Sequence, residues 1–200
     1  MSNIERRAVL AGLSATAVAA AAPRALAAEK FTGDVVLGDS DAPLTIVEYA
    51  SLTCPHCAAF HQGAWPKVKE AYVDTGKVRF IMREVYFDKY GLWAAMTARC
   101  GGERGYYSMI DTFLNTQSSW TRAEDIGAEI QKIGRRAGLS SDQLSACLSD
   151  RDYAKTLLES YQDNAKTDNV RSTPTFIIGG DLHSGNMSYE EFAALIDSKL

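Results

Sequence analysis

The chain has 200 residues, of which 46% are hydrophobic and 23% are charged, as in an ordinary globular protein. This length is enough for one domain with a sizeable core, or for one domain that carries a large insertion. The formal net charge of −4 gives no sign of the basic surface that nucleic-acid binding needs, so we expect no nucleic-acid partner.

The first residues have the pattern of an export signal. A basic start with a pair of arginines leads into an apolar, alanine-rich stretch over 8–22, and 25–27 (Ala-Leu-Ala) has the small residues of a cleavage site. The alternatives are a membrane anchor and an ordinary N-terminal helix, but the apolar stretch is short for a membrane span. We expect residues 1–27 to be a cleaved signal peptide, read by the general secretory or the twin-arginine route. The mature part, 28–200, is then a soluble protein in a compartment where disulfides persist.

The rest of the chain alternates short strands with helices. The first predicted elements are a buried strand over 44–50, a helix from Cys54 to about Thr75 with a bend near Gly63 or Pro66, and a strand over 77–84. A helical block follows from about 89 to 167. The last elements are a strand over 175–178, a turn at 179–181 with a return strand near 182–184, and a final helix from Ser188 to Leu200. Inside the block, we expect helices over 92–100 and 106–114, one opened by a capping box at 121–124, a short one around Cys147 after a serine cap at 140 or 141, and one over 151–167. This order predicts an α/β fold in which a helical insertion separates a βαβ unit from a ββα unit.

Cys54-Pro55-His56-Cys57 lies where the first predicted strand meets a helix, which is typical of a dithiol/disulfide redox centre. At the first turn of a helix, unpaired N–H groups and the positive end of the helix dipole stabilise the Cys54 thiolate, which is the nucleophilic form. His56 adds a positive charge or a hydrogen bond in the same turn. Cys57 lies one turn further on, where we expect it to be buried and to resolve the mixed disulfide.

Two other interpretations fit this motif. One is a structural disulfide, and the other is half of a zinc site whose remaining thiolates come from Cys100 and Cys147. Zinc is the weaker alternative, because four-thiolate sites usually come as two close pairs. Covalent haem is excluded because Ala58, and not histidine, follows Cys57. We expect neither a metal nor a bound cofactor.

The other cysteines and two histidines lie outside the motif. Cys100 and Cys147 lie in the predicted helical insertion, and the even number of four cysteines is consistent with two pairs. Export to an oxidising compartment favours a second disulfide between them over two separate buried thiols. His61 and His183 have no partner visible in the sequence, so we expect surface or capping positions for both.

Three groups of residues together resemble the DsbA-like family of thioredoxin-fold disulfide oxidoreductases, and the likeness covers nearly all of the mature chain. They are 46–49 with 54–57, 105–107 with 113–114, and 172–176 with Gly180. The resemblance implies a thioredoxin fold with a helical insertion and a periplasmic location. It also agrees with a bridge between Cys100 and Cys147, which some members of the family carry.

The resemblance further implies roles for three residues. In related proteins an acidic residue at the position of Glu48 lies beneath the active site and helps to move the proton of the buried cysteine. A buried carboxylate can act as such a base, and the alternative is that Glu48 reaches solvent at an edge. Pro174 is expected to follow a cis peptide bond that faces Cys54, which leaves the backbone of Thr173 open to pair with an extended substrate. The alternative is a trans proline that opens an edge strand.

The leading hypothesis is a periplasmic oxidoreductase that introduces disulfides into unfolded or newly exported cysteine-containing proteins. The resemblance implies reoxidation by a DsbB-like membrane quinone reductase. A second hypothesis is an isomerase or reductase on the same fold. Thr173 favours it, because many strong oxidases of the family have valine there, whereas the short mature N-terminus favours a monomer and argues against an isomerase. A third hypothesis is a non-catalytic, chaperone-like module that binds peptides and whose disulfide is structural.

Overall fold

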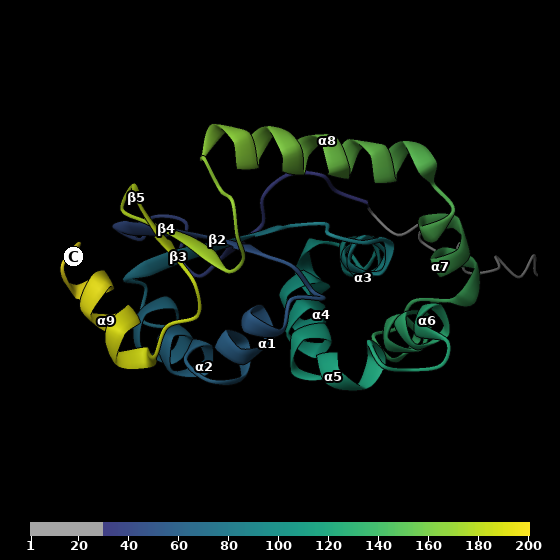
Figure 1. The fold of residues 1–200 in the computed structure, drawn as a ribbon, viewed down its shortest axis with the longest axis horizontal. Coiled ribbons are helices and arrows are strands. Elements are labelled where there is room, and N and C mark those ends of the chain that lie inside the picture. Colours follow the sequence, from purple (N-terminus) through teal and green to yellow (C-terminus); the bar gives the residue numbers. More distant parts are fainter. Residues whose placement is uncertain (1–29) are drawn as a thin grey trace, which may run out of the picture.

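The computed structural model of the protein describes residues 30–200, so the expected signal peptide lies outside the described part. The elements, in chain order (Figure 1), are β1 (Val36–Leu37), β2 (Leu44–Ala50), α1 (Pro55–Gln62), α2 (Trp65–Val68), the π-helical segment η1 (Lys69–Val73), β3 (Val78–Glu84), α3 (Lys89–Cys100), α4 (Glu103–Asn115), α5 (Gln117–Trp120), α6 (Ile126–Arg136), α7 (Ser141–Leu148), α8 (Arg151–Thr167), β4 (Thr175–Ile178), β5 (Asp181–Ser184) and α9 (Tyr189–Asp197).

The strands of the described chain form one five-stranded sheet in the order β1-β3-β2-β4-β5. β2 is the central strand, parallel to β3 and antiparallel to β4, with Ile46 opposite Phe80 on one side and Ile178 on the other. The parallel pair needs a crossover, which α1, α2 and η1 supply, whereas β4 and β5 are joined directly by a tight turn. The predicted βαβ and ββα units are therefore confirmed.

Helices cover both faces of this sheet. In Figure 1, α1, α2 and α9 lie below the sheet, and α8 runs above it, while α3 to α7 extend to one side. The helices inserted between β3 and β4 begin at Lys89 and end at Thr167. Within residues 30–200, none of the helices combines the length and apolar character needed to cross a membrane.

A cluster of aromatic side chains fixes α1 and α9 against the sheet. Phe60 of α1 lies with its ring centroid 4.6 Å from that of Phe176 on β4 and 5.1 Å from that of Phe192 on α9. Trp65 stacks at 4.2 Å on Phe80 of β3. Each fully buried aromatic or aliphatic side chain of this size contributes roughly 1.5–3 kcal/mol through removal of its apolar surface from water. The position of α1, and hence of the cysteine motif at its start, is set by this packing.

The helix expected from Cys54 to Thr75 is divided into three segments. Gly63 leaves the helical conformation, with φ −109° and ψ −84°, and α1 ends there. Pro66 lies in the first turn of α2, where the missing N–H would have no partner in any case. The expected bend is therefore a break between two helices.

The capping box predicted at 121–124 is wrong. Asp125, not Thr121, caps α6, because its side chain accepts the backbone N–H of Ala128 at 2.9 Å. The hydroxyl of Thr121 instead donates to the carbonyl of Gln117 and closes the short helix α5. The predicted Ser188 cap of α9 is confirmed, although α9 ends at Asp197 rather than Leu200.

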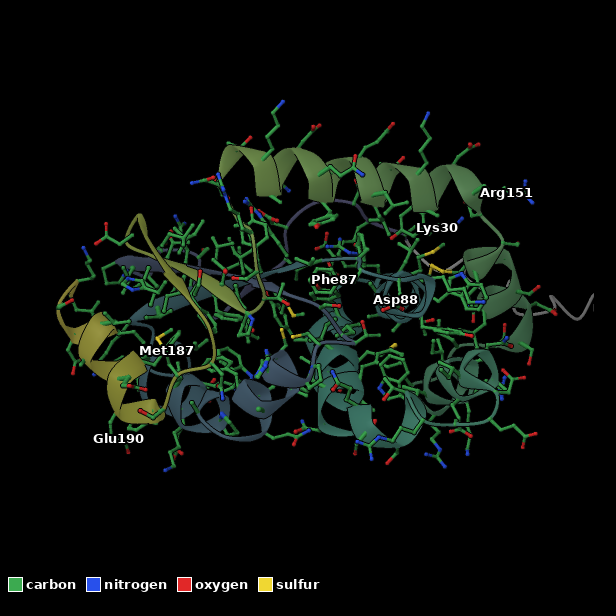
Figure 2. The ribbon with its side chains drawn as sticks, viewed as in Figure 1. Lys30, Phe87, Asp88, Arg151, Met187 and Glu190 are labelled. Carbon is green, nitrogen blue, oxygen red and sulfur yellow. A yellow bond between two sulfur atoms is a disulfide. The ribbon has the colours of Figure 1, made fainter. Side chains whose placement is uncertain are left out.

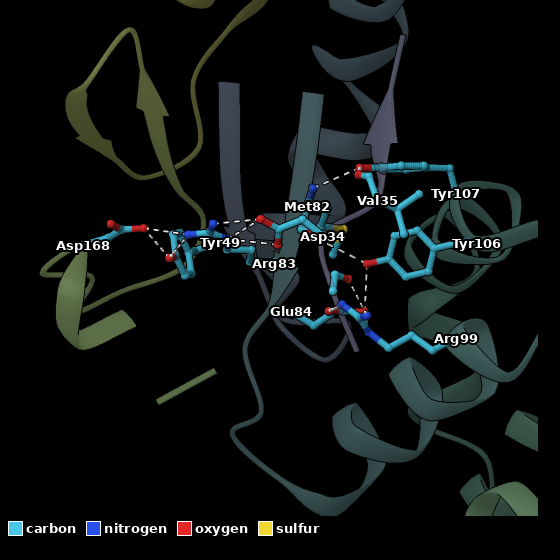
Figure 3. A network of polar contacts seen from close by, with 11 residues as sticks. Asp34, Val35, Tyr49, Met82, Arg83, Glu84, Arg99, Tyr106, Tyr107 and Asp168 are labelled. Atoms are coloured by element: carbon cyan, nitrogen blue, oxygen red, sulfur yellow. Dashed lines mark hydrogen bonds and ion pairs between the residues drawn. The ribbon is translucent and has the colours of Figure 1, made fainter. Parts of the chain in front are cut away.

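A polar network ties the outer side of the sheet to α8 and to the segment before β1 (Figure 3). Arg83 of β3 lies between Asp34 and Asp168 and makes an ion pair of 2.8 Å with each. It also donates to the hydroxyl of Tyr49 on β2 at 2.8 Å. The end of α8 is therefore held to β2 and β3 by hydrogen bonds and ion pairs.

A second, fully buried ion pair joins β3 to the helical insertion. Arg99 of α3 donates to Glu84 through two nitrogens, at 2.8 and 2.6 Å. Tyr106 of α4 donates to the same carboxylate at 2.8 Å, and Arg99 also donates to the carbonyl of Gly33 at 3.0 Å. The buried charge of Glu84 is thus matched by a two-pronged guanidinium contact, which is the geometry that such a pair requires.

Candidate active site

Cys54 occupies the N-cap position of α1, at the end of the loop that follows β2. Its backbone is extended (φ −81°, ψ 120°), and its N–H donates to the carbonyl of Ser51 at 3.1 Å. Pro55 is the first helical residue, which suits proline because a helix leaves its first N–H groups unpaired. The Cys54 thiol is free and partly exposed at the helix start.

The surroundings of Cys54 favour its thiolate. A hydrogen bond from the Cys57 side chain has the largest effect, and the Thr173 side chain and the backbone N–H groups of Cys57 and His56 add to it. These contacts outweigh the opposing effect of partial burial and lower the pKa of Cys54 to about 5. His56 contributes through its backbone here, while its side chain is exposed.

Cys57 lies one helical turn further on and has the opposite character. It is a free thiol with 0% of its surface exposed. Its hydrogen bond to Cys54, its burial and the charge of Glu48 together raise the pKa of Cys57 far above its usual range. One cysteine is therefore a partly exposed nucleophile, and the other is a buried thiol that keeps its proton.

A loop from the other half of the fold faces Cys54. The Thr173–Pro174 peptide bond before β4 is cis, as the resemblance implied. The Cys54 sulfur lies 3.6 Å from the carbonyl oxygen of Thr173. The helix start and the proline loop thus meet at the reactive sulfur.

Glu48 of β2 is completely buried, and its charge acts on the Cys57 thiol. Its partner is His61, whose Nε2 lies 2.8 Å from Oε2 of Glu48. The surface position expected for His61 is wrong, because only 2% of the residue is exposed. The spacing of four residues from Cys57 could have indicated this, since both residues then share one face of the helix. His183 lies half-buried in β5.

Comparison with known proteins now adds to this geometry. The sequence profile of the thioredoxin family matches residues 30–198. Wolbachia pipientis alpha-DsbA1 is 31% identical to this chain in sequence, and its crystal structure superimposes with a TM-score of 0.77 over 84% of this chain and 91% of that one. The chain belongs to the DsbA-like thioredoxins. BdbD of Bacillus subtilis has the same fold, with a TM-score of 0.74 over 83% of this chain and 92% of that one. The two sequences are 22% identical.

Among curated proteins, the DsbA-like chain is 32% identical over 168 residues to a putative protein-disulfide oxidoreductase of Rickettsia bellii. The match covers 84% of this chain and 64% of the Rickettsia protein. The chain therefore spans less than two thirds of that relative's length.

The helical insertion of the DsbA-like chain holds the active-site loop in place. Gln117 of α5 donates to the carbonyls of Leu52 and Cys54, at 2.8 and 3.0 Å. Asp88, which caps α3, accepts the hydroxyl proton of Thr53 at 2.7 Å. Sequence reasoning missed Gln117 and Asp88, because nothing in the local pattern shows that the insertion folds back onto this loop.

Cys100 of α3 and Cys147 of α7 are joined by a disulfide and are almost completely buried. Two of the four thiolates that the zinc alternative needs are therefore bonded to each other, which excludes that four-cysteine site. In the described part of the chain, no group of three or more histidine, cysteine or acidic side chains is placed to hold a metal ion.

An open hollow of about 440 Å³ lies beside α1, between that helix and the connection from β5 to α9. Ala59 and Gly63 line it on one side, and Met187 and Tyr189 line it on the other. Met187 and Glu190, which are labelled in Figure 2, are among its lining residues. The hollow borders α1 at Ala59 and Gly63, in the part of the helix that lies away from Cys54.

Proposed function

We propose that the protein is a periplasmic thiol:disulfide oxidoreductase that introduces disulfides into exported proteins. The observation that carries this proposal is the opposite acidity of the two cysteines, with the pKa of Cys54 lowered to about 5. A stabilised thiolate favours the dithiol over the disulfide and makes Cys54 a good leaving group. The Cys54–Cys57 disulfide is therefore readily donated.

The exchange has two steps. A substrate thiolate attacks the Cys54 sulfur, a substrate–Cys54 disulfide forms, and the bond to Cys57 breaks, after which Cys57 takes up a proton. The second substrate thiolate then attacks the substrate sulfur of this mixed disulfide and expels Cys54 as a thiolate. Two electrons pass from the substrate to the cysteine pair, and the substrate leaves with a disulfide.

The backbone of Thr173, next to the cis proline, is the proposed docking strand for an extended, unfolded substrate. A DsbB-like membrane quinone reductase is the proposed partner that reoxidises the dithiol. No bound cofactor is part of this reaction. We further propose that the protein works as a monomer.

The test is the oxidation of a reduced, unfolded protein that contains two cysteines. Oxidised wild-type protein is expected to convert it to the disulfide form, whereas Cys54→Ser and Cys57→Ser are both expected to be inactive, because neither variant can form the disulfide that accepts the two electrons. A wild-type protein that does not oxidise this substrate would contradict the proposal and favour the chaperone-like module.

Thr173 supports a second candidate, an isomerase or reductase, because many strong oxidases of the family have valine at this position before the cis proline. The two candidates differ in the direction of electron flow. A protein that rearranges a substrate with wrong disulfides faster than it oxidises a reduced one would favour the second candidate.

A further inference from the structure

The buried pair of Glu48 and His61 carries two polar atoms that disulfide exchange, as set out above, does not use. Oε2 of Glu48 and Nε2 of His61 contact each other at 2.8 Å. The other oxygen, Oε1 of Glu48, and the other ring nitrogen, Nδ1 of His61, are buried and have no hydrogen-bond partner within residues 30–200. Buried polar atoms without partners are rare in folded proteins and call for a physical explanation.

The pair relates to two different neighbours, Cys57 and Asp111. Alternation along β2 places Glu48 on the same sheet face as Ala50, which shares the hydrophobic core with Cys57, and the charge of Glu48 acts on the Cys57 thiol. At the other end, Nδ1 of His61 lies 3.7 Å from Oδ1 of Asp111 on α4, whose side chain is 39% exposed. The charge of Glu48 thus reaches the buried thiol, and contacts of 2.8 and 3.7 Å join Glu48 to His61 and His61 to the partly exposed Asp111.

We propose that His61 and Asp111 form a proton path that links Glu48, and through it Cys57, with solvent. This inference rests on the proposed function and gives His61 and Asp111 the role of positioning residues, since neither touches a reacting sulfur. It assigns a role to each unpartnered atom, because Oε1 of Glu48 accepts a proton and Nδ1 of His61 releases one.

The proton and the electron pair can be followed most easily when Cys57 resolves a mixed disulfide. The Cys57 proton moves to Oε1 of Glu48, the Cys57–Cys54 bond forms, and the sulfur previously bound to Cys54 leaves with the electron pair. His61, initially an imidazolium, then releases its Nδ1 proton past Asp111 to solvent. The pair is neutral before and after, so no net charge is left in the core. Substrate oxidation uses the same path in reverse.

The charges around His61 support this assignment. Burial disfavours the imidazolium, but the carboxylates of Glu48 and Asp111 outweigh burial and raise the pKa of His61 to about 9. Glu48 from β2 and Asp111 from α4 are the charged groups that face the ring in the described chain, and the rings of Phe60 and Trp65 pack beside it. His61 is therefore charged at neutral pH and places a positive charge beside the Glu48 carboxylate.

The test follows the resolution step alone. Reduced protein is mixed with oxidised glutathione and quenched with acid at short times, and mass spectrometry counts the mixed disulfide from about pH 6 to about pH 9. Wild-type protein is expected to resolve it at a rate that changes little with pH. In His61→Gln, Glu48 loses the positive charge beside it and its link to Asp111, so resolution at neutral pH is expected to slow by about tenfold or more and to recover as the pH rises.

Asp111→Asn is expected to change the rate in the same direction by a smaller factor. It changes a side chain that is 39% exposed, so it decides the question if His61→Gln does not fold. The matched control is Asp163→Asn, an exposed aspartate on α8, which is expected to behave as wild type. Wild-type rates and a flat pH profile in both His61→Gln and Asp111→Asn would overturn the proton path alone. A wild type that forms neither the mixed disulfide nor the Cys54–Cys57 disulfide would overturn the proposed function as well.

Discussion

Cys54 and Cys57 have the same side chain, but the fold gives them opposite acidity. Cys54 meets the N–H groups at the start of α1 and is partly exposed, whereas Cys57 is fully buried and lies near the charge of Glu48. The thiol of Cys57 also donates to Cys54, so one hydrogen bond moves the two pKa values in opposite directions. This difference assigns attack to one sulfur and resolution to the other.

The stability of the reduced protein should depend on pH through Cys54. Its pKa is about 5 in the folded dithiol form and, as for an ordinary thiol, about 8.5 in the unfolded chain. Because the folded value is the lower one, the thiolate stabilises the reduced protein fully above about pH 8.5, and this stabilisation is lost as the pH falls to about 5. The free energy of unfolding in urea can be measured for both redox forms. As the pH falls from about 8.5 to about 5, the reduced form should lose stability relative to the oxidised form. A difference that does not vary with pH would contradict the lowered pKa.

At the scale of elements, the helical insertion is attached to the thioredoxin-like half by a few polar contacts that cross long stretches of sequence. Gln117 of α5 holds the loop before Cys54, and Arg99 of α3 pairs with Glu84 of β3. The Cys100–Cys147 bridge closes a loop with a sequence separation of 47 residues and fastens α7 to α3. In the loop-entropy model such a closure contributes roughly 4 kcal/mol.

The buried ion pair predicts a large loss of stability when one partner is removed. Arg99→Met leaves the Glu84 carboxylate in the core without its cation, and we expect the free energy of unfolding to fall by roughly 3–5 kcal/mol. The double variant Glu84→Gln/Arg99→Met removes the unpaired charge and should recover part of this loss. Chemical denaturation of the three proteins measures both effects, and an Arg99→Met variant within about 0.5 kcal/mol of wild type would show that the pair is unimportant.

The sequence indicated those elements whose pattern is local. β2 and β4 are rich in apolar and β-branched residues, α8 has the predicted bounds, and the cysteine motif marks the start of α1. The burial of His61 was missed because its partner, Glu48, lies on another element. The cap at Asp125 was missed because the Thr121 hydroxyl turns back to α5 instead of capping α6. The contacts of Gln117 were missed for the same reason.

At the scale of the whole molecule, the fold brings together three distant parts of the chain. The strand β2 carries Glu48, the start of α1 carries the two cysteines, and the loop before β4 carries Thr173 and Pro174. The helical insertion supports this meeting point from the side, while the proline loop leaves the Cys54 sulfur partly open to a partner polypeptide. An exchange of electrons between sulfur atoms needs only this open sulfur, a buried second thiol and a route for its proton.

The most direct measurement is the redox equilibrium of Cys54 and Cys57 against glutathione buffers, in a Cys100→Ala/Cys147→Ala variant that leaves a single titrating pair. A reduction potential well above the glutathione poise is expected, because the Cys54 thiolate stabilises the dithiol form. The disulfide would then be the form that is donated. A potential near that of thioredoxin, about −270 mV, would make the dithiol the donor and contradict the proposed oxidase.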